Sequence, residues 1–122
     1  MTIAARHAPG PVAYNHLVAD FIGVPSDQLR DSALLSGLII AAASAAGLPG
    51  IGIPSVRKSL GGGSIIALLQ PNTHIVVHSF PEAGLLLLDV LASESCDLRK
   101  GLDVFSRRLA PRETRSDIRA RG

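Results

Sequence analysis

The 122-residue chain contains no tryptophan, one tyrosine, three phenylalanines and a single cysteine, Cys96. One cysteine excludes an intramolecular disulfide framework, and no His/Cys spacing in the sequence resembles a zinc site. Aromatic residues make up only 3% of the chain, which disfavours the stacking platforms that bind single-stranded nucleic acid. The N-terminus also lacks the charged region and apolar run of a secretory signal, so we expect a cytoplasmic protein.

Hydrophobic residues make up 47% of the sequence, which suits one folded domain with its own core and excludes a disordered chain. The formal net charge of +2 is unevenly distributed, because the segment from Arg107 onward carries six arginines and two acidic residues. We therefore expect residues 110–122 to form a basic, flexible tail, residues 1–12 a flexible leader, and residues 13–109 the folded domain. Nothing in that domain indicates a nucleic-acid partner.

Apolar patterning predicts both strands and helices in the domain. An imperfect period of two indicates a strand over 14–22, and a Leu/Ala-rich segment from Pro25 to a stop at Gly47 indicates one long helix. Further runs predict the start of a strand at 51–53, strands at 64–70, 73–80 and 85–91, and a helix over 97–109. Because short links join neighbouring strands, we expect an α+β fold, a two-layer sandwich in which two helices cover one face of a mainly antiparallel sheet.

Two patterns that suggest other functions are better explained as structure. Residues 32–53 carry no charge and are long enough to cross a bilayer, but the Gly/Pro break at 47–50 favours a helix packed on a sheet, so we expect no membrane partner. The three glycines at 61–63 lack the Gly-Lys-Ser/Thr ending of a phosphate-binding loop and precede a strand. They therefore predict a turn.

Polar residues gather in and after the predicted strand 73–80. His74 and His78 lie four residues apart, so both side chains point to the same face of the sheet. Two histidines without a third ligand do not predict a metal site, and we expect no metal. Glu82 lies two residues after Phe80 in a predicted turn, where its carboxylate can accept hydrogen bonds from substrate hydroxyl groups.

Residues 72–84 read Asn-Thr-His-Ile-Val-Val-His-Ser-Phe-Pro-Glu-Ala-Gly. This segment resembles the motif Glu-Ser-His-x-x-x-His-Thr-Trp-Pro-Glu-x-Gly of the short bacterial and archaeal class of S-adenosylmethionine decarboxylase proenzymes. The first strand, with His-Leu-Val-Ala-Asp-Phe at 16–21, the run Leu-Asp-Val at 88–90 and the helix at 100–109 extend the resemblance over residues 15–109. The resemblance implies an enzyme of polyamine and spermidine biosynthesis.

The resemblance implies that the proenzyme cleaves its own backbone. In the family, a serine hydroxyl attacks the preceding carbonyl, the resulting ester eliminates, and the serine becomes a pyruvoyl group. The ketone forms a Schiff base with the substrate amine and acts as an electron sink while carbon dioxide leaves. Here Thr73 replaces the serine, so cleavage is expected between Asn72 and Thr73 and yields a 2-oxobutanoyl group. Members assemble as dimers whose protomers build the sites together, which implies a homodimer.

The resemblance also assigns roles to single residues. His78 matches the histidine that assists processing, and Ser64 matches the hydroxyl residue that works with it, with one extra residue before Thr73. Glu82 matches the acidic residue that contacts the substrate ribose, and Phe80 stands where a tryptophan is usual. With His74, these two residues form the expected substrate-binding set.

Several positions depart from the family pattern. The proton-donating cysteine is replaced by Ser93, and Cys96 lies three residues further on, where it can substitute only if the loop bulges. A serine hydroxyl is a much weaker acid than a thiol, so this change is expected to impair proton transfer. The glutamate before the cleavage site is Asn72, and the upstream aromatic residues that grip adenine are absent from residues 55–59.

These departures leave two alternatives to an active S-adenosylmethionine decarboxylase. The changes at Asn72, Thr73 and Ser93 favour a homologue that does not process itself and acts as the partner of an active paralogue or as a module that binds an adenosine-like ligand. The missing upstream aromatic residues are consistent with a decarboxylase of another amino acid, such as arginine or ornithine.

Overall fold

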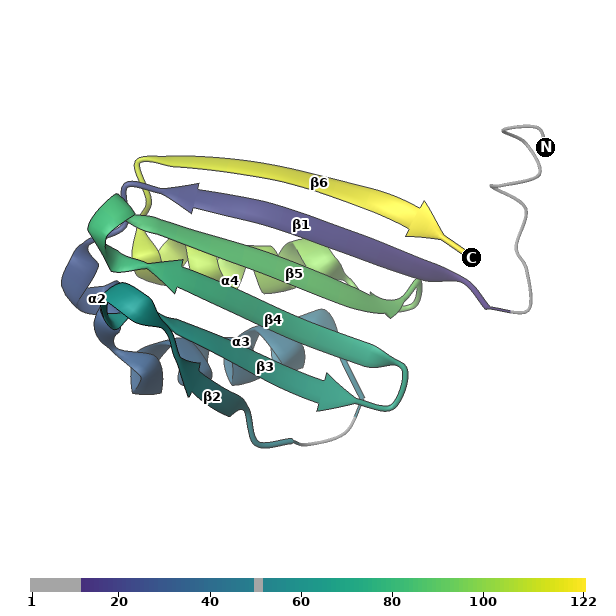
Figure 1. Cartoon of the computed structure of the whole chain (residues 1–122). Helices are drawn as coiled ribbons and strands as arrows, with labels where there is room; N and C mark the ends of the chain where they lie inside the picture. Colours follow the sequence, from purple (N-terminus) through teal and green to yellow (C-terminus); the bar gives the residue numbers. More distant parts are fainter. Residues whose placement is uncertain (1–11, 50–51) are drawn as a thin grey trace.

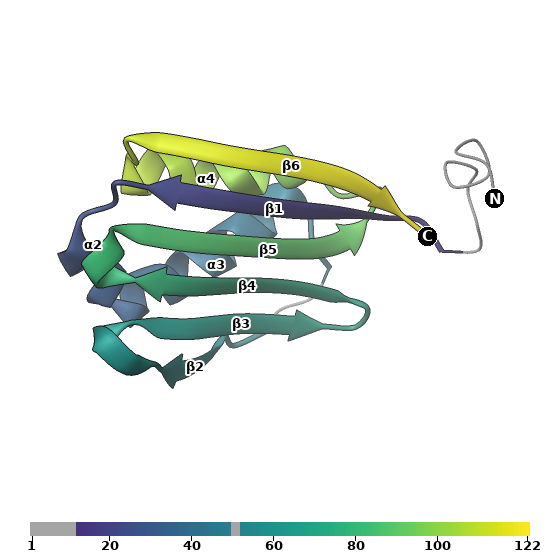
Figure 2. The same ribbon diagram turned by 45° about the horizontal axis from the view of Figure 1, so that its top comes forward.

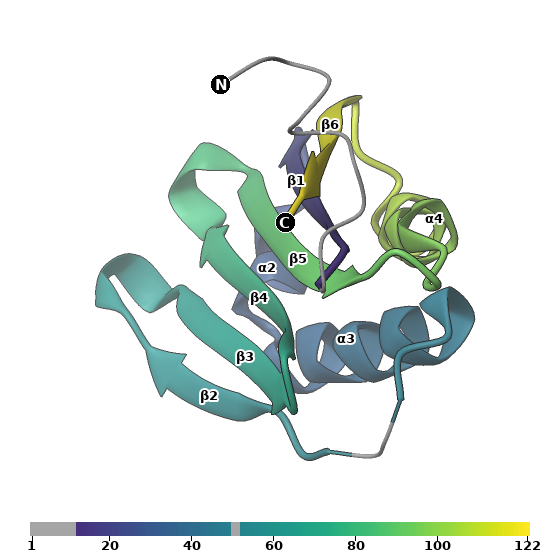
Figure 3. The ribbon, with the colours of Figure 1, turned by 90° about the vertical axis from the view of Figure 1, so that its right-hand side faces the viewer.

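The computed structural model describes residues 12–49 and 52–122, so the predicted leader lies outside the described residues except for Val12. These residues form one six-stranded antiparallel sheet with the strand order β2-β3-β4-β5-β1-β6 (Figure 1). Helices α3 and α4 pack side by side on one face of the sheet, as the end-on view in Figure 3 shows. The structure thus confirms the expected two-layer α+β sandwich. In the described part of the chain, no helix has the length and apolar character needed to cross a membrane.

The sheet contains six strands, and their neighbours in the sheet are easiest to follow in Figure 2. The strands are β1 Tyr14–Ile22, β2 Ser55–Lys58, β3 Ser64–Gln70, β4 Thr73–Phe80, β5 Leu85–Ser93 and β6 Glu113–Arg121. The helices are α2 Ser26–Arg30, α3 Ser32–Ala46 and α4 Leu98–Leu109, with short 3₁₀ turns η1 Leu60–Gly62 and η2 Pro81–Ala83.

Alternate residues of the central strands build the core between the sheet and the helices. Burial alternates along β4 and β5 with a period of two, as expected for strands with one covered face. Phe21 on β1 and Phe105 on α4 are fully buried, and their rings stack with centroids 5.9 Å apart. The other sheet face, which α3 and α4 leave uncovered, is called the open face below.

The predicted long helix is wrong in one respect, because it divides into α2 and α3 at Asp31. Asp31 has non-helical dihedral angles, and its carboxylate accepts a hydrogen bond from the backbone N–H of Leu34 at 3.0 Å. It therefore caps a new helix instead of continuing the old one. Gly47 ends α3 as predicted, in the left-handed conformation with φ 79°. The strand predicted to start at 51–53 lies further along, at β2, and Ile51 itself is outside the described residues.

The prediction of a flexible tail at 110–122 is also wrong. Residues Glu113–Arg121 form β6, which pairs antiparallel with β1 from Ile22↔Glu113 to Tyr14↔Arg121. The charged residues of this segment alternate with Thr, Ser, Ile and Ala, which is a strand pattern that the high net charge conceals. Pairing with β1 also satisfies backbone groups that would otherwise be exposed along the edge of that strand.

Candidate active site

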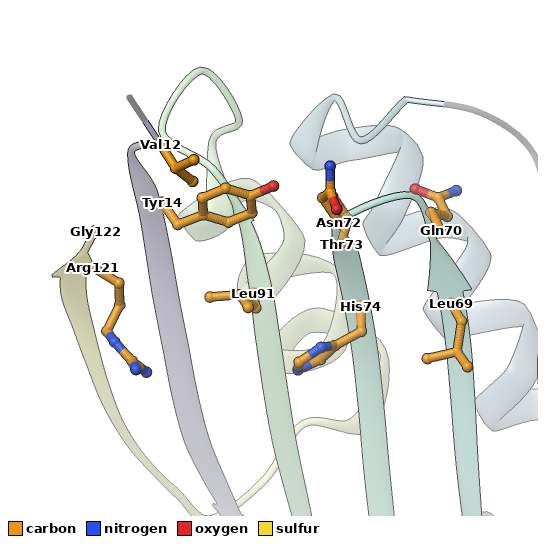
Figure 4. A pocket seen from close by; sticks show the side chains of 10 residues that line it. All are labelled: Val12, Tyr14, Leu69, Gln70, Asn72, Thr73, His74, Leu91, Arg121 and Gly122. Carbon is orange, nitrogen blue, oxygen red and sulfur yellow. The ribbon is translucent and has the colours of Figure 1, made fainter. Parts of the chain in front are cut away.

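A cavity of about 690 Å³ opens at one end of the open face (Figure 4). It extends from the β3–β4 turn across β5 to the start of β1 and the end of β6. Its walls come from strands that are far apart in the sequence but adjacent in the sheet. The lining residues are Val12, Tyr14, Leu69, Gln70, Asn72, Thr73, His74, Leu91, Arg121 and Gly122.

The β3–β4 hairpin carries the predicted cleavage site to the rim of this cavity. Gln70 and Thr73 are paired, so Pro71 and Asn72 form a two-residue turn. Asn72 adopts a left-handed conformation with φ 58°, which asparagine tolerates better than most residues other than glycine. Thr73 is 8% exposed, and both it and Asn72 line the cavity. The peptide bond between them therefore lies at the edge of a space large enough for a small-molecule ligand.

Two histidines converge on one carboxylate beneath the cavity. The Nε2 atoms of His16 on β1 and His74 on β4 each lie 3.0 Å from Oδ1 of Asp89 on β5. Burial acts to raise the pKa of the Asp89 carboxyl, but hydrogen bonds from His74 and His16 outweigh it, and the resulting pKa is lower than usual. Asp89 is therefore ionised at neutral pH and accepts from both rings. No group of three or more His, Cys, Asp or Glu side chains among the described residues is arranged to hold a metal ion.

Arg121 extends this network to the edge strand. Its Nη1 lies 3.3 Å from Nδ1 of His16. A guanidinium group has no acceptor, so Nδ1 of His16 accepts and carries no proton. The proton of His16 is then on Nε2, where it is donated to Asp89. The chain Arg121–His16–Asp89–His74 thus crosses four adjacent strands, β6, β1, β5 and β4, and its two ends line the cavity.

The predicted processing residues do not meet Thr73 within one chain. His78 lies on the same strand five residues further on, so their Cα atoms are about 17 Å apart. Ser64 lies further away still, because its backbone N–H donates to Oγ of Ser79 at 2.9 Å near the far end of β4. Ser64 is fully buried, and its Oγ has no hydrogen-bond partner among the described residues.

The expected substrate-binding residues are likewise divided between the two ends of β4. His74 lines the cavity near Thr73. Phe80 and Glu82 lie at the opposite end of the strand, where Phe80 is 43% exposed and Glu82 is exposed in η2. The predicted cleavage site thus lies at one end of the sheet. Most residues predicted to assist processing or to bind the substrate lie at the other end.

The two candidates for the proton donor lie in different surroundings. Ser93 ends β5 opposite Tyr14, a cavity residue, and its Oγ is 3.1 Å from Oγ of Ser95. Cys96 is buried on the helix side, where its Sγ lies 3.6 Å from the carbonyl oxygen of Gly47 at the end of α3. Both residues thus lie near the end of the sheet that contains Thr73, but Ser93 is on the open face and Cys96 belongs to the core on the helix side.

Sequence reasoning missed the roles of His16, Asp89 and Arg121 at this site. The sequence identifies His16 and Asp89 only as parts of matching strands, and it places Arg121 in the predicted tail. The signal available for His16 and Asp89 is a polar residue at an alternating position of a mostly apolar strand. The register that brings these residues together was not available from the pattern.

A family model, curated relatives and a solved structure all match this chain over most of its length. The family model described as S-adenosylmethionine decarboxylase matches residues 15–122. The S-adenosylmethionine decarboxylase proenzyme of Brevibacillus brevis is 30% identical over 108 residues, which cover 88% of this chain and 80% of that protein. The arginine decarboxylase proenzyme of Aeropyrum pernix is 28% identical over 101 residues, which cover 80% of this chain and 76% of that protein. The crystal structure of the adenosylmethionine decarboxylase from Aquifex aeolicus has a TM-score of 0.79 and 25% identity, and the match covers 91% of this chain and 92% of that one. The family match therefore extends through β6.

Proposed function

The chain belongs to the S-adenosylmethionine decarboxylase family, and from this premise we propose that it cleaves itself between Asn72 and Thr73 and then decarboxylates S-adenosylmethionine. The observation that carries the proposal is the position of Thr73, which is one of the residues that line the cavity. The family is one of pyruvoyl-dependent carboxy-lyases, in which the residue after the cleaved bond becomes the electrophile. The residue with the hydroxyl that this chemistry requires thus lies at the edge of a space where a ligand has room to bind.

The proposed cleavage converts Thr73 into a ketone. Oγ of Thr73 attacks the carbonyl carbon of Asn72, and the C–N bond breaks to leave an ester and a free amino group. Loss of the Thr73 Hα and cleavage of its Cβ–Oγ bond release fragment 1–72 with a terminal carboxylate. Tautomerisation and addition of water then release ammonia, so residue 73 becomes a 2-oxobutanoyl group and not pyruvoyl. Such a ketone supplies the electron sink for decarboxylation.

We further propose that the working unit is a homodimer with composite sites. The cleavage site and the processing residues lie at opposite ends of β4, and Thr73 is about 17 Å from His78 in the same chain. A second copy that packs on the open face with its strands reversed would bring the end of β4 that carries Thr73 towards the partner's His78. This arrangement supplies the imidazole that Thr73 lacks in its own chain.

The composition of the open face supports this partner. Exposed apolar side chains stand on it in several strands, with Val18 42%, Leu69 71% and Phe80 43% exposed. Apolar groups grouped on one face favour burial against another protein surface. A second copy offers the same apolar surface in return, as a two-fold interface requires.

In this dimer, the substrate-binding set is shared between the two copies. We propose that His74 acts beside Thr73 in one copy, while Phe80 and Glu82 come from the partner and contact the nucleoside. Ser93 is the proposed proton donor, because it lies at the cleavage end of the sheet, opposite Tyr14.

Intact mass spectrometry of the purified chain tests the proposal. Self-cleavage predicts a fragment 1–72 and a fragment 73–122 that is lighter than the hydrolysis product by one molecule of ammonia. A cleaved chain that releases carbon dioxide from carboxyl-labelled S-adenosylmethionine supports the decarboxylase. A single uncut chain that releases none overturns it and favours a non-processing homologue, acting as the partner of an active paralogue or as a binding module for an adenosine-like ligand.

A second candidate, decarboxylation of another amino acid, is favoured by two observations. No aromatic residue occurs at 55–59, where the family holds adenine, and the side chains of β2 there are exposed. One relative of similar identity is named an arginine decarboxylase proenzyme. Release of carbon dioxide from arginine or ornithine, with none from S-adenosylmethionine, would replace the first proposal by this one.

A further inference from the structure

The last residue of β5, Ser93, is hydrogen-bonded to a second serine two residues further along the chain. Its Oγ lies 3.1 Å from Oγ of Ser95 and 3.3 Å from the backbone nitrogen of Ser95. The backbone N–H donates to Oγ of Ser93, and the Ser95 hydroxyl can donate to the same oxygen. With both donors in place, the hydroxyl proton of Ser93 can be directed to another acceptor.

Backbone hydrogen bonds fix the turn that carries Ser95. Within the turn, the N–H of Cys96 donates to the carbonyl oxygen of Ser93 at 2.9 Å. On the side of β1, the N–H of Glu94 donates to the carbonyl oxygen of Ala13 at 3.2 Å. Ser95 itself is exposed, so its hydroxyl also reaches solvent. The turn therefore holds the two donors of Ser95 against Ser93 and connects them to water.

Ser93 lies close to the predicted cleavage site because β5 is next to β4 in the sheet (Figure 2). The register pairs His74 with Leu91, and Ser93 lies two residues beyond Leu91 on the same face. Neighbouring strands are about 4.8 Å apart, so one strand spacing separates the strand of Ser93 from that of Thr73. A substrate amine bonded to residue 73 would bring the carbon that carries its carboxyl group to this end of the two strands.

We propose that Ser95 is a positioning residue that makes the Ser93 hydroxyl a stronger acid, an inference that rests on the function proposed above. When carbon dioxide has left, the substrate carbon takes up the hydroxyl proton of Ser93, and Oγ of Ser93 becomes an anion. The N–H and O–H of Ser95 donate to this anion, and such charge-assisted hydrogen bonds are stronger than those to a neutral oxygen. Water then returns one proton through the exposed Ser95 hydroxyl, which restores both serines.

The replacement of the family's cysteine gives this pair its importance. A thiol ionises readily near neutral pH, whereas a serine hydroxyl does not. Hydrogen bonds to the charged form of a group favour that form and lower its pKa. The two donors of Ser95 thus act on the property in which Ser93 is weaker than the cysteine it replaces.

A thiol placed at residue 93 measures this effect directly. Cys96 is the only native cysteine, so the full chain carrying Ser93→Cys and Cys96→Ala has a single thiol, and Thr73→Ala keeps that chain uncut. Alkylation by iodoacetamide requires the thiolate, so the pH dependence of its rate gives the pKa of the thiol. Adding Ser95→Ala removes the hydroxyl donor and should raise this pKa, so that alkylation at pH 7 slows about threefold to tenfold.

Access and folding are controlled separately. A change in access alters the limiting rate of alkylation at high pH but leaves the midpoint of the pH profile unchanged. Ser116→Ala, the same substitution at an exposed serine of β6, should also leave that midpoint unchanged. The thermal midpoint of each variant shows whether it remains folded. A pH midpoint that does not rise in a folded Ser95→Ala chain overturns the inference.

Turnover of the otherwise native chain provides a second readout. Ser95→Ala should lower kcat and leave KM and the rate of self-cleavage nearly unchanged, because Ser95 acts on proton transfer and not on substrate binding. Ser95→Thr keeps both donors and should restore kcat. Equal losses in both variants would contradict the role of the hydroxyl.

The thiol measurement distinguishes failure of this inference from failure of the proposed function. It uses an uncut chain, so a rise in the pH midpoint with Ser95→Ala supports the effect of Ser95 on residue 93 even if the wild-type chain never cleaves itself. An unchanged midpoint shows that this inference is wrong, even if the wild-type chain cleaves itself and releases carbon dioxide.

Discussion

His74 donates from Nε2 to Oδ1 of Asp89 at 3.0 Å, and this bond ties the residue that follows Thr73 to the centre of the sheet. The same oxygen also accepts a hydrogen bond from Nε2 of His16, so one carboxylate orients side chains from both β1 and β4. Thr73 is the first residue of β4. The side chain of the next residue, His74, lies on the open face and is held in place by its hydrogen bond to Asp89. The proposed electrophile would form on a rigid element, which is the arrangement that accurate positioning requires.

Replacing Thr73 by serine should accelerate self-cleavage. Serine keeps the attacking hydroxyl but removes the methyl group that crowds its approach to the Asn72 carbonyl. The product would also change, because a serine at this position gives pyruvoyl and not 2-oxobutanoyl. A time course by intact mass spectrometry follows both effects. Thr73→Ala should remain uncut, and cleavage of that variant at the same bond would contradict the role of the hydroxyl.

The sequence predicted the layers of this fold well because those layers depend on local patterning. The alternation in β3, β4 and β5 reports one covered face, and Gly47 gives a clear stop to α3. These signals are independent of the rest of the chain, so they can be interpreted without a structure.

The errors arose where tertiary context decides the outcome. Asp31 lies in a helical pattern, but its side chain begins a new helix by capping Leu34. Strand β6 has a charged sequence that forms a strand only because the edge of β1 is available to pair with it. The pairing of His16 with Asp89 depends on the register between β1 and β5, which a period of two leaves undetermined.

Asp89→Asn should alter the dependence of stability on pH. The folded state lowers the pKa of Asp89, so its carboxylate stabilises the fold above the unfolded pKa, about 3.9, and this contribution is lost as the pH falls through the lower folded value. The Asp89 side chain is 43% exposed, so solvent screening keeps the effect small.

Denaturant unfolding of wild type and Asp89→Asn between pH 7 and pH 3 measures this contribution. The stability difference between the two chains should shrink as the pH falls below about 5, where the unfolded carboxyl takes up its proton first. Asp117→Asn removes a carboxylate from the exposed edge strand and serves as the control. A difference that grows towards pH 3 would show that the pKa is not lowered by folding.

Ser93→Cys should raise turnover without changing the rate of self-cleavage. A thiol is a far stronger acid than a serine hydroxyl, and Ser93 lies at the cleavage end of the sheet, so a cysteine there should transfer a proton more readily. Gains from a well-placed acid start at about a hundredfold, and a tenfold rise would already support the assignment. Cys96→Ala is the matched control, since its thiol faces the Gly47 carbonyl on the helix side and should not affect turnover.

Composite sites predict that two inactive variants rescue each other. His78→Ala should not cleave by itself because it lacks the imidazole, and Thr73→Ala should not cleave because it lacks the hydroxyl. In a mixed dimer, the Thr73→Ala copy keeps an intact His78, which would lie beside Thr73 of the His78→Ala copy. Mass spectrometry of the mixture should therefore show cleavage of the His78→Ala chains alone. A single chain cannot bring these residues together across about 17 Å of one strand, so no cleavage in a mixture that sediments as a dimer would mean that the imidazole is not supplied by the partner.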